Sequence, residues 1–190
     1  MGPAVREEFE PICAAAGINW PPAQIQMIAF KQERTLELWG GNPEGPLHFL
    51  VEFPVMGLSG QLGPKSQIGD RQVPEGFYRL THLNPQSDFH LSIRVDYPNQ
   101  EDVENRQVEL DEMGGDIYIH GNEVSIGCLA MGDPAIEKIF CLTAWAHPDH
   151  RNIIISPLDF RTGGNPAVTS NSWLQDLYSR QQAALEDFKR

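Results

Sequence analysis

The stretch IYIHGNEVSIGCLAMGDPAIEKIF, residues 117–140, predicts a short strand, a glycine-flanked loop and a helix. Because strand side chains alternate, the two isoleucines before His120 face one way while Tyr118 and His120 face the other. His120 is therefore expected at the end of the strand, on the side away from the core. The loop that follows is long enough to bring Cys128 back beside His120.

Cys128 and His120 are candidates for a catalytic pair. A thiolate is the form of cysteine that attacks a carbonyl, and a neighbouring imidazole can accept the proton that the thiol loses. Gly127 would let a carbonyl approach the backbone, and the amides of Gly127 and Cys128 could donate to an oxyanion. A free cysteine or a single histidine is also a common packing residue, so on spacing alone a packed, non-catalytic pair stays open.

The sequence argues against a nucleic-acid-binding protein and against a membrane-spanning one. There are 26 acidic and 14 basic residues, a formal charge of -12, so a nucleic-acid backbone would meet net repulsion. The basic cluster at 31–34 contains Glu33 and is typical of a hairpin tip. No segment reaches the roughly 18 apolar residues of a membrane span, and no signal peptide is visible. We therefore expect a globular chain that does not span a membrane.

Cysteine and histidine counts leave one further kind of site to consider. Three cysteines cannot form a dense disulfide framework, and Cys13 and Cys141 fall in helical patterns that favour packing. His147 and His150, with His120 or Asp159, could together offer ligands to zinc. Two histidines three residues apart after a helix also occur without metal. We therefore expect no metal and no cofactor.

Hydrophobic periodicity predicts a β-rich α+β fold. Apolar and polar side chains alternate over 89–96, which places Phe89 on a buried face and Ser92 and Arg94 toward solvent or a groove. A helix is expected to begin with Asp133 as its cap, and a last helix with Ser172 in a capping box. The expected segments are helices 3–16, 133–146 and one after 172, strands 25–30, 35–39, 48–55, 77–83, 89–97, 117–120 and 153–156, and a glycine-rich loop 57–76.

Two blocks of sequence resemble a known family. The first is GPKSQIGDRQVPEGFYRL, residues 63–80, and the second is IHGNEVSIGCLAMGDPAIEKIF, residues 119–140. Together they are similar to the L,D-transpeptidase catalytic domain (YkuD-like) family, and within it to the YafK-like branch. The resemblance covers about residues 20–160 and implies the mixed-sheet fold of that family with flanking helices. The domain organisation it suggests is an N-terminal helix or arm over 1–22, a catalytic domain over 23–160, and a C-terminal loop and helix over 161–190.

The resemblance implies a role for particular residues. Cys128 corresponds to the nucleophile, His120 to the general base, the carbonyl of Gly121 to the group that orients the imidazole, and Gly127 to the oxyanion position. Four further residues are candidates for binding substrate: Ser125, Tyr118, Lys65 and Arg94. Lys65 also matches the first block together with Asp70, Pro74 and Gly76, which we interpret as shaping the loop.

The activity implied is cysteine-dependent acyl transfer on peptidoglycan stem peptides at meso-diaminopimelate. The sequence departs from the broad family at Ile126, where a second histidine is usual, and in the shorter spacing from His120 to the cysteine. Hydrolysis, including release of a linked lipoprotein, therefore stands beside transpeptidation. A non-catalytic wall-binding module is the alternative of another class, and a zinc amidase is a third. The substrate implies the periplasm or cell envelope.

Overall fold

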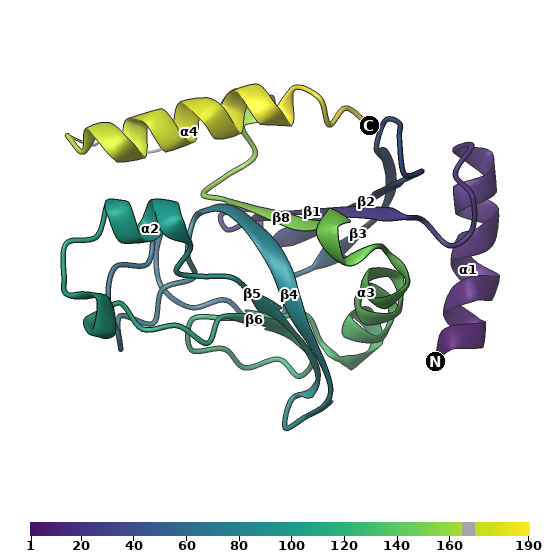
Figure 1. The fold of residues 1–190 in the computed structure, drawn as a ribbon, viewed down its shortest axis with the longest axis horizontal. Coiled ribbons are helices and arrows are strands. Elements are labelled where there is room, and N and C mark those ends of the chain that lie inside the picture. Colours follow the sequence, from purple (N-terminus) through teal and green to yellow (C-terminus); the bar gives the residue numbers. More distant parts are fainter. Residues whose placement is uncertain (165–169) are drawn as a thin grey trace.

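One mixed β-sheet forms the centre of the molecule (Figure 1). The structure is a computed structural model that describes residues 1–164 and 170–190. The strand order within this part is β3-β2-β1-β8-β4-β5-β6-β7, with β1–β8 and β6–β7 parallel and the other neighbours antiparallel. The strands are β1 (Gln24–Phe30), β2 (Thr35–Gly41), β3 (His48–Pro54), β4 (Gly76–Ser87), β5 (His90–Val95), β6 (Tyr118–His120), β7 (Leu129–Ala130) and β8 (Arg151–Ser156).

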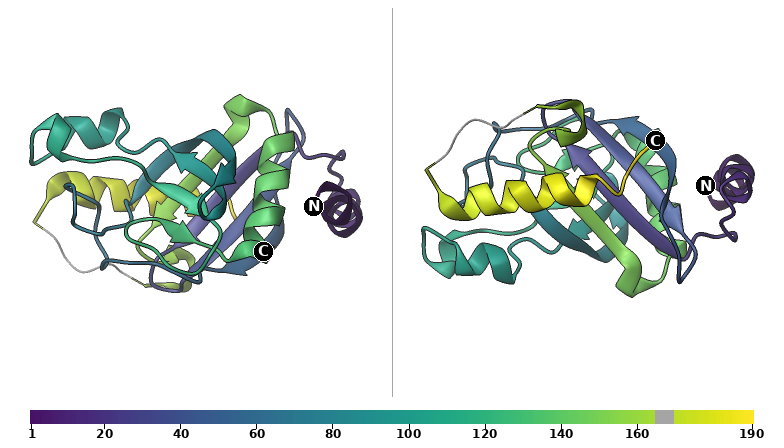
Figure 2. Two further views of the ribbon diagram at one scale, coloured as in Figure 1. Left: turned by 90° about the horizontal axis from the view of Figure 1, so that it is seen from below. Right: turned by 90° about the horizontal axis from the view of Figure 1, so that it is seen from above.

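Helices cover both faces of this sheet. Figures 1 and 2 show α4 across one face of β1 and β8, and α3 on the opposite face, with α1 outside α3. The α-helices are α1 (Gly2–Ala15), α2 (Gln100–Glu104), α3 (Asp133–Trp145) and α4 (Ser172–Leu185). Short 3₁₀ turns occur at Leu110–Glu112, Pro148–His150 and Phe160–Thr162. The prediction of an α+β fold with a mixed sheet and flanking helices is therefore confirmed.

The central strands bury side chains on both faces, which explains why they read as continuous apolar runs. In β1, Met27 belongs to the core beneath α3, whereas Ile28 belongs to the core beneath α4. Helix α1 contributes Phe9 and Cys13, both fully buried, to the first of these cores. Helix α4 contributes Leu177 to the second.

Both expected helix caps lie one residue from the observed ones. Gly132 is the N-cap of α3, and Asp133, the expected cap, instead accepts a hydrogen bond at 2.8 Å from the amide of Asn122. Asn171 caps α4 by accepting from the amide of Leu174, so Ser172 is the first helical residue. At α4 a neighbouring side chain with the same capping chemistry made the assignment ambiguous from sequence, whereas the cap of α3 is a glycine that makes no side-chain hydrogen bond.

The predicted alternation over 89–96 is wrong at Phe89. This residue lies in the turn between β4 and β5 and is 44% exposed, so it does not join the buried face. Ser92, expected toward solvent or a groove, lines a cavity and is only 5% exposed, because it lies opposite His120 of β6 in the strand register. Strand pairing by a segment far along the chain is what the local pattern could not reveal.

The hairpin expected around 31–34 forms between β1 and β2, but its first residue is not solvated. Lys31 is 3% exposed, and its Nζ lies 2.8 Å from Oε1 of Glu75, which is fully buried. The same Nζ donates to the carbonyls of Gly63 at 2.8 Å and Val73 at 2.9 Å. Tyr178 of α4 donates to the other oxygen of Glu75 at 2.6 Å. This buried cluster joins β1, the loop 57–75 and α4.

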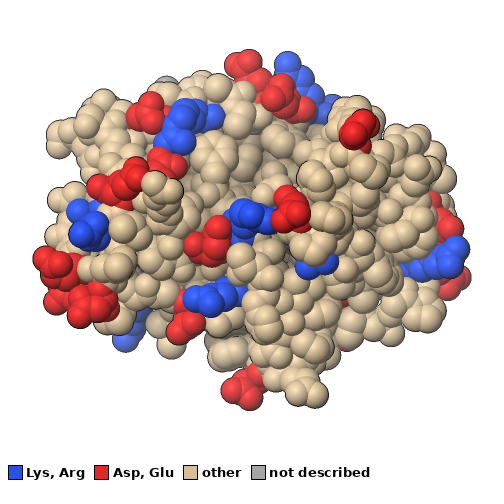
Figure 3. Space-filling view, in the orientation of Figure 1, with Lys and Arg blue, Asp and Glu red and all other residues tan. Residues whose placement is uncertain are grey.

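Charges on the surface are mostly of mixed sign. Figure 3 shows acidic and basic side chains side by side on the face seen in Figure 1. Two of the exposed ion pairs join Arg79 to Asp149 and Lys138 to Glu8. Within the described residues, no helix is long and apolar enough to cross a membrane.

Replacing Lys31 with Met should destabilise the protein strongly, because it leaves the buried Glu75 carboxylate without its cation. We expect the free energy of unfolding to fall by about 3–5 kcal/mol, measured by urea denaturation followed by circular dichroism. The matched control is Asp149→Asn, which breaks an ion pair whose side chains are 55% and 72% exposed. That control should change stability by less than about 1 kcal/mol. Equal effects of the two substitutions would contradict the assigned role of the buried pair.

Candidate active site

His120 ends β6 and is held in one orientation by the backbone. Its Nδ1 lies 2.6 Å from the carbonyl oxygen of Gly121, so Nδ1 carries the proton and Nε2 keeps a lone pair. The imidazole is 4% exposed, and the ring of Phe89 stands against it with centroids 4.8 Å apart. Burial lowers the pKa of His120, against a smaller opposing effect of the Gly121 hydrogen bond. The imidazole is therefore neutral near pH 7 and able to accept a proton.

Gly121 has to be glycine because neighbouring atoms leave no room for a Cβ at this position. A Cβ at this position would lie 2.6 Å from Oδ1 of Asp133 and 2.7 Å from the carbonyl oxygen of Phe89. Its amide donates to the carbonyl of Leu91 at 3.1 Å. These contacts fix the carbonyl that holds His120 and turn the chain sharply into the loop before Cys128.

Ser125 braces the turn that presents Cys128. Its hydroxyl accepts from the amide of Cys128 at 2.9 Å and donates to the carbonyl of the same residue at 2.6 Å. Gly127 has φ +107, a conformation that side-chain-bearing residues rarely adopt. The glycine between them lets the chain turn abruptly into β7, which pairs in parallel with β6. In this register His120 lies opposite Ala130, so Cys128 lies alongside the start of β6, at Tyr118.

Cys128 and His120 line the same cavity, which has a volume of about 570 Å³. The thiol is partly buried and donates to the carbonyl of Asp116 at 3.7 Å. Burial raises the pKa of Cys128; a backbone hydrogen bond and the charge of Lys65 lower it, and the charge of Asp116 raises it further. The resting site therefore holds a neutral thiol beside a neutral imidazole.

The two amides expected to stabilise an oxyanion are both engaged by hydroxyls. Gly127 N donates to Oγ of Ser59 at 2.6 Å, and Cys128 N donates to Oγ of Ser125. Ser59 lies in the loop 57–75, and its hydroxyl also donates to the carbonyl of Arg71 at 2.8 Å. An oxyanion at Gly127 would have to take the place of the Ser59 hydroxyl.

The four expected substrate-binding residues divide into two groups. Tyr118 lines the cavity, and Ser125 contacts the backbone of Cys128 directly. Lys65 is instead paired with Asp70 at 2.6 Å and donates to the carbonyl of Gln67. Arg94 is exposed opposite Tyr118 in the strand register and does not belong to the cavity lining. Of the four, only Tyr118 lines the cavity; Ser125 instead holds the backbone of Cys128 in place.

Three residues of the site were not singled out from the sequence. Phe89 contacts His120 from the β4–β5 turn, Asp116 accepts from the thiol, and Ser59 accepts from Gly127. Asp116 has φ +56, a left-handed conformation that aspartate tolerates better than most residues. Asp116 lies in an acidic segment without hydrophobic periodicity, so the sequence pattern gave no reason to select it. The contacts of Ser59 and Phe89 join segments that are far apart in the sequence.

The histidine cluster considered for zinc does not gather a third ligand. Among the described residues, no group of three or more His, Cys, Asp or Glu side chains could hold a metal ion. His147 and His150 lie with ring centroids 5.6 Å apart, and both are exposed. The other cysteines, Cys13 and Cys141, are buried free thiols in α1 and α3.

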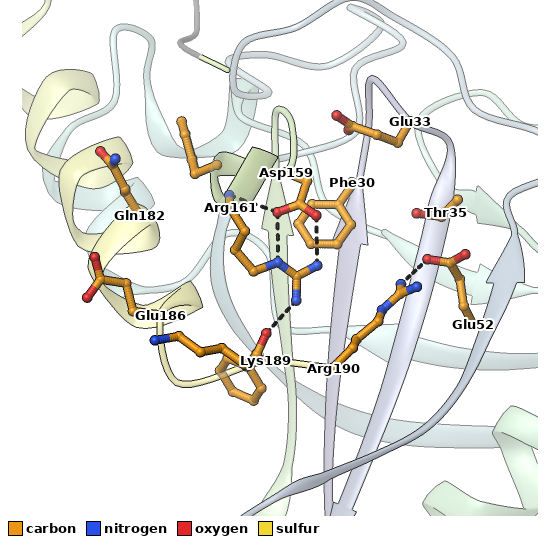
Figure 4. A pocket seen from close by; sticks show the side chains of 12 residues that line it. Phe30, Glu33, Thr35, Glu52, Asp159, Arg161, Gln182, Glu186, Lys189 and Arg190 are labelled. Carbon is orange, nitrogen blue, oxygen red and sulfur yellow. Dashed lines mark hydrogen bonds and ion pairs between the residues drawn. The ribbon is translucent and has the colours of Figure 1, made fainter. Parts of the chain in front are cut away.

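A larger cavity, of about 850 Å³, lies between α4 and the strands β1, β2 and β3 (Figure 4). Four of its charged side chains form ion pairs: Arg161 makes two contacts with Asp159, and Arg190 contacts Glu52. Arg161 also forms an ion pair of 2.6 Å with the fully buried Glu37. The described residues that line this cavity include neither cysteine nor histidine. These ion pairs fasten the end of the chain to the sheet, and the smaller cavity at Cys128 is the better candidate for chemistry.

Comparison with known proteins finds a family for the central part of the chain. Residues 51–144 match the model of the YkuD family, the L,D-transpeptidase catalytic domain. These residues belong to that family. The match includes β4, β5, the turn with Cys128 and nearly all of α3.

Individual relatives match over part of their length. YafK of Escherichia coli (strain K12), named as a candidate L,D-transpeptidase, is 38% identical over 121 residues, which are 63% of this chain and 46% of that protein. The helical cell shape determining protein Pgp2 of Campylobacter jejuni has a TM-score of 0.54 at 22% identity, over 70% of this chain and 46% of that one. Bd1075 of Bdellovibrio bacteriovorus has a TM-score of 0.51 at 18% identity, over 87% and 55%. At these identities the two structures support the fold of the domain.

The raised pKa of Cys128 predicts how its reactivity depends on pH. The rate of alkylation by iodoacetamide should rise with pH and level off only above the ordinary thiol pKa of about 8.5. Because the imidazole is already neutral, His120→Ala should leave that inflection nearly unchanged. Rates would be followed at Cys128 by peptide mass spectrometry. A plateau below pH 7 that disappears in His120→Ala would instead reveal a thiolate–imidazolium pair in the resting protein.

Proposed function

We propose that this domain is a cysteine-dependent acyltransferase that acts on peptidoglycan stem peptides at meso-diaminopimelate. The observation that carries the proposal is one cavity lined by both Cys128 and His120, in a segment of the L,D-transpeptidase family. The hydrogen bond from Nδ1 to Gly121 leaves Nε2 as the basic nitrogen. This is the arrangement that a thiol nucleophile with a general base requires.

In the first half of the reaction, His120 takes the thiol proton as Cys128 attacks the scissile carbonyl. The sulfur forms a bond to carbon, and the oxyanion is stabilised by the amide of Gly127, from which the Ser59 hydroxyl withdraws. Collapse of the intermediate breaks the carbon–nitrogen bond, and the imidazolium gives its proton to the leaving amine. A thioester on Cys128 and a neutral imidazole remain.

The second half decides between transfer and hydrolysis. An amine acceptor gives L,D-transpeptidation, whereas water gives hydrolysis of the amide, including release of a linked lipoprotein. In either case His120 takes a proton from the incoming group and returns it to the sulfur. Digestion of defined muropeptides, followed by mass spectrometry, distinguishes crosslinked dimers from cleaved stems. With this substrate the protein would act in the periplasm or cell envelope.

A wall-binding module without catalysis is the second candidate. The observation in its favour is the resting thiol, which donates to the Asp116 carbonyl and has a raised pKa. Acylation by a carbapenem separates the two functions, because only a competent nucleophile forms a covalent adduct. An adduct at Cys128 in the intact-protein mass spectrum supports the enzyme. Binding to sacculi with neither adduct nor turnover supports the module.

Removal of either member of the pair should abolish turnover without unfolding the domain. We expect Cys128→Ala and His120→Ala each to lower the rate of muropeptide conversion by at least about a hundredfold. Circular dichroism should show an unchanged fold for Cys128→Ala, because that side chain is only partly buried. Cys141→Ala, which removes a buried thiol in α3 remote from the cavity, should retain activity. Full activity of Cys128→Ala would refute the mechanism.

Ser59 and Ser125 both contact the turn before Cys128, but their substitution should affect kcat differently. Ser59→Ala removes the hydroxyl that must leave Gly127 before an oxyanion binds, so kcat should be unchanged or modestly raised. Ser125→Ala removes both hydrogen bonds that brace Cys128 and should lower kcat about tenfold or more, with a smaller effect on KM. Steady-state kinetics on a defined muropeptide would measure both. If Ser59→Ala lowered kcat as much as Ser125→Ala, the Ser59 hydroxyl would take part in catalysis and would not merely occupy the amide of Gly127.

A further inference from the structure

The carboxylate of Asp133 bonds to a separate loop and not to the end of its own helix. An aspartate followed by proline is expected to cap a helix, but Gly132 is the N-cap of α3 and makes no side-chain hydrogen bond. Oδ1 of Asp133 instead accepts from the amide of Asn122 at 2.8 Å. A side chain that is diverted from its usual local partner to a loop elsewhere indicates a role in that loop.

The amide bound by Asp133 belongs to the peptide that orients the imidazole of His120. In the peptide unit between Gly121 and Asn122, the carbonyl oxygen lies 2.6 Å from Nδ1 of His120, and the N–H donates to the carboxylate. The C=O and N–H of a trans peptide lie in one plane and point in opposite directions. The imidazole, the peptide and the carboxylate therefore form one chain of two hydrogen bonds.

The beginning of α3 holds the same turn at two further points. The amide of Met131 donates to the carbonyl of His120 at 2.8 Å. The amide of Gly132 donates to the carbonyl of Asn122 at the same distance. The backbone on either side of the orienting peptide is thus fastened to the start of the helix. The N–H of that peptide is held by a side chain instead, the carboxylate of Asp133.

A carboxylate at the end of this chain has its largest effect when the imidazole becomes charged. In the proposed reaction Nε2 of His120 takes the thiol proton while Nδ1 keeps its own, so the ring becomes an imidazolium. Hydrogen bonds in series polarise one another, so an anionic acceptor on the N–H makes the Gly121 carbonyl a stronger acceptor for the charged ring. The proton stays on Nδ1, and none passes to Asp133. The carboxylate therefore stabilises the imidazolium without touching it.

The helix that begins at Asp133 gives a second reason for an anion here. The N-terminus of a helix carries a partial positive charge, which disfavours another positive charge nearby. Asp133 is the acidic residue in the first turn of α3, next to the turn that carries His120. Burial already lowers the pKa of His120, so a further cost to the imidazolium would make the ring a weaker base.

We propose that Asp133 is a positioning residue that acts on His120 through the Gly121–Asn122 peptide. It fixes the carbonyl that keeps a proton on Nδ1, and its charge stabilises the imidazolium that forms during acyl transfer. In serine hydrolases a carboxylate accepts directly from the catalytic histidine, whereas here one peptide unit stands between the two groups. The inference rests on the proposed function for the reaction, but the state of the imidazole can be measured without turnover.

Nitrogen NMR of the His120 ring tests this action directly. The neutral ring of the wild type should be the Nδ1–H tautomer. Asp133→Ala removes both the hydrogen bond and the charge, so the ring should change toward a mixture of tautomers and its pKa should fall. Asp133→Asn keeps an oxygen acceptor without the charge, so the tautomer should be retained while the pKa still falls. The control is Glu123→Gln, which removes an exposed carboxylate one residue after Asn122 and should leave both properties nearly unchanged.

Two results of the NMR measurement would overturn the proposal. One is an unchanged tautomer together with an unchanged His120 titration in Asp133→Ala, even if the unfolding midpoint falls, because Asp133 would then serve only the stability of α3. The other is an equal fall of the His120 pKa in Glu123→Gln, because the effect would then be one of general surface charge.

Turnover of a defined muropeptide gives a second measurement. Asp133→Ala should lower kcat about tenfold or more with less than about a threefold change in KM, and Asp133→Asn should recover part of the loss. Wild-type kcat in Asp133→Ala would refute the proposal. If the wild type converts no muropeptide, the proposed function fails, and the ring titration alone decides the role of Asp133.

Discussion

The buried ion pair between Lys31 and Glu75 is the constraint on which both the fold and the site depend. A buried pair contributes little net stability compared with apolar packing, but removing one partner is very unfavourable, so it fixes a single arrangement. Here the pair connects the end of β1 with both legs of the loop 57–75, at Gly63 and at Val73, and Tyr178 extends the connection to α4. The ion pair thereby fixes the positions of β1, the loop 57–75 and α4 relative to one another.

That constraint reaches the nucleophile through the loop. Gly57, where the loop begins, exchanges backbone hydrogen bonds of 3.0 Å in both directions with Ala130 of β7, two residues after Cys128. Ser59 caps the amide of Gly127, and the carbonyl of Gln72 would lie 3.3 Å from a Cβ at Gly127. The loop therefore encloses the turn that presents the thiol. Loosening its anchor at Lys31 would shift the turn as well as the core.

The sequence predicts the parts of this structure whose signals are local. All the strands that the structure describes except the two-residue β7 follow from alternation, and the helix after Cys128 follows from its cap and proline. Resemblance and glycine placement single out His120, Gly121, Gly127 and Cys128 as site candidates. What it misses depends on contacts between distant segments. Lys31 resembles an ordinary hairpin-tip residue, but it pairs with the distant Glu75, and Phe89 resembles a buried strand residue, but it lies in the exposed β4–β5 turn.

The same reason explains why charge states at the site do not follow from the sequence. Spacing suggests that the imidazole ionises the sulfur, yet burial favours the neutral form of both groups, and the resting thiol bonds to the Asp116 carbonyl. Charge state is set by desolvation and by neighbours such as Asp116, which belongs to a segment without periodicity. No pattern within the HGNEVSIGC stretch contains that information.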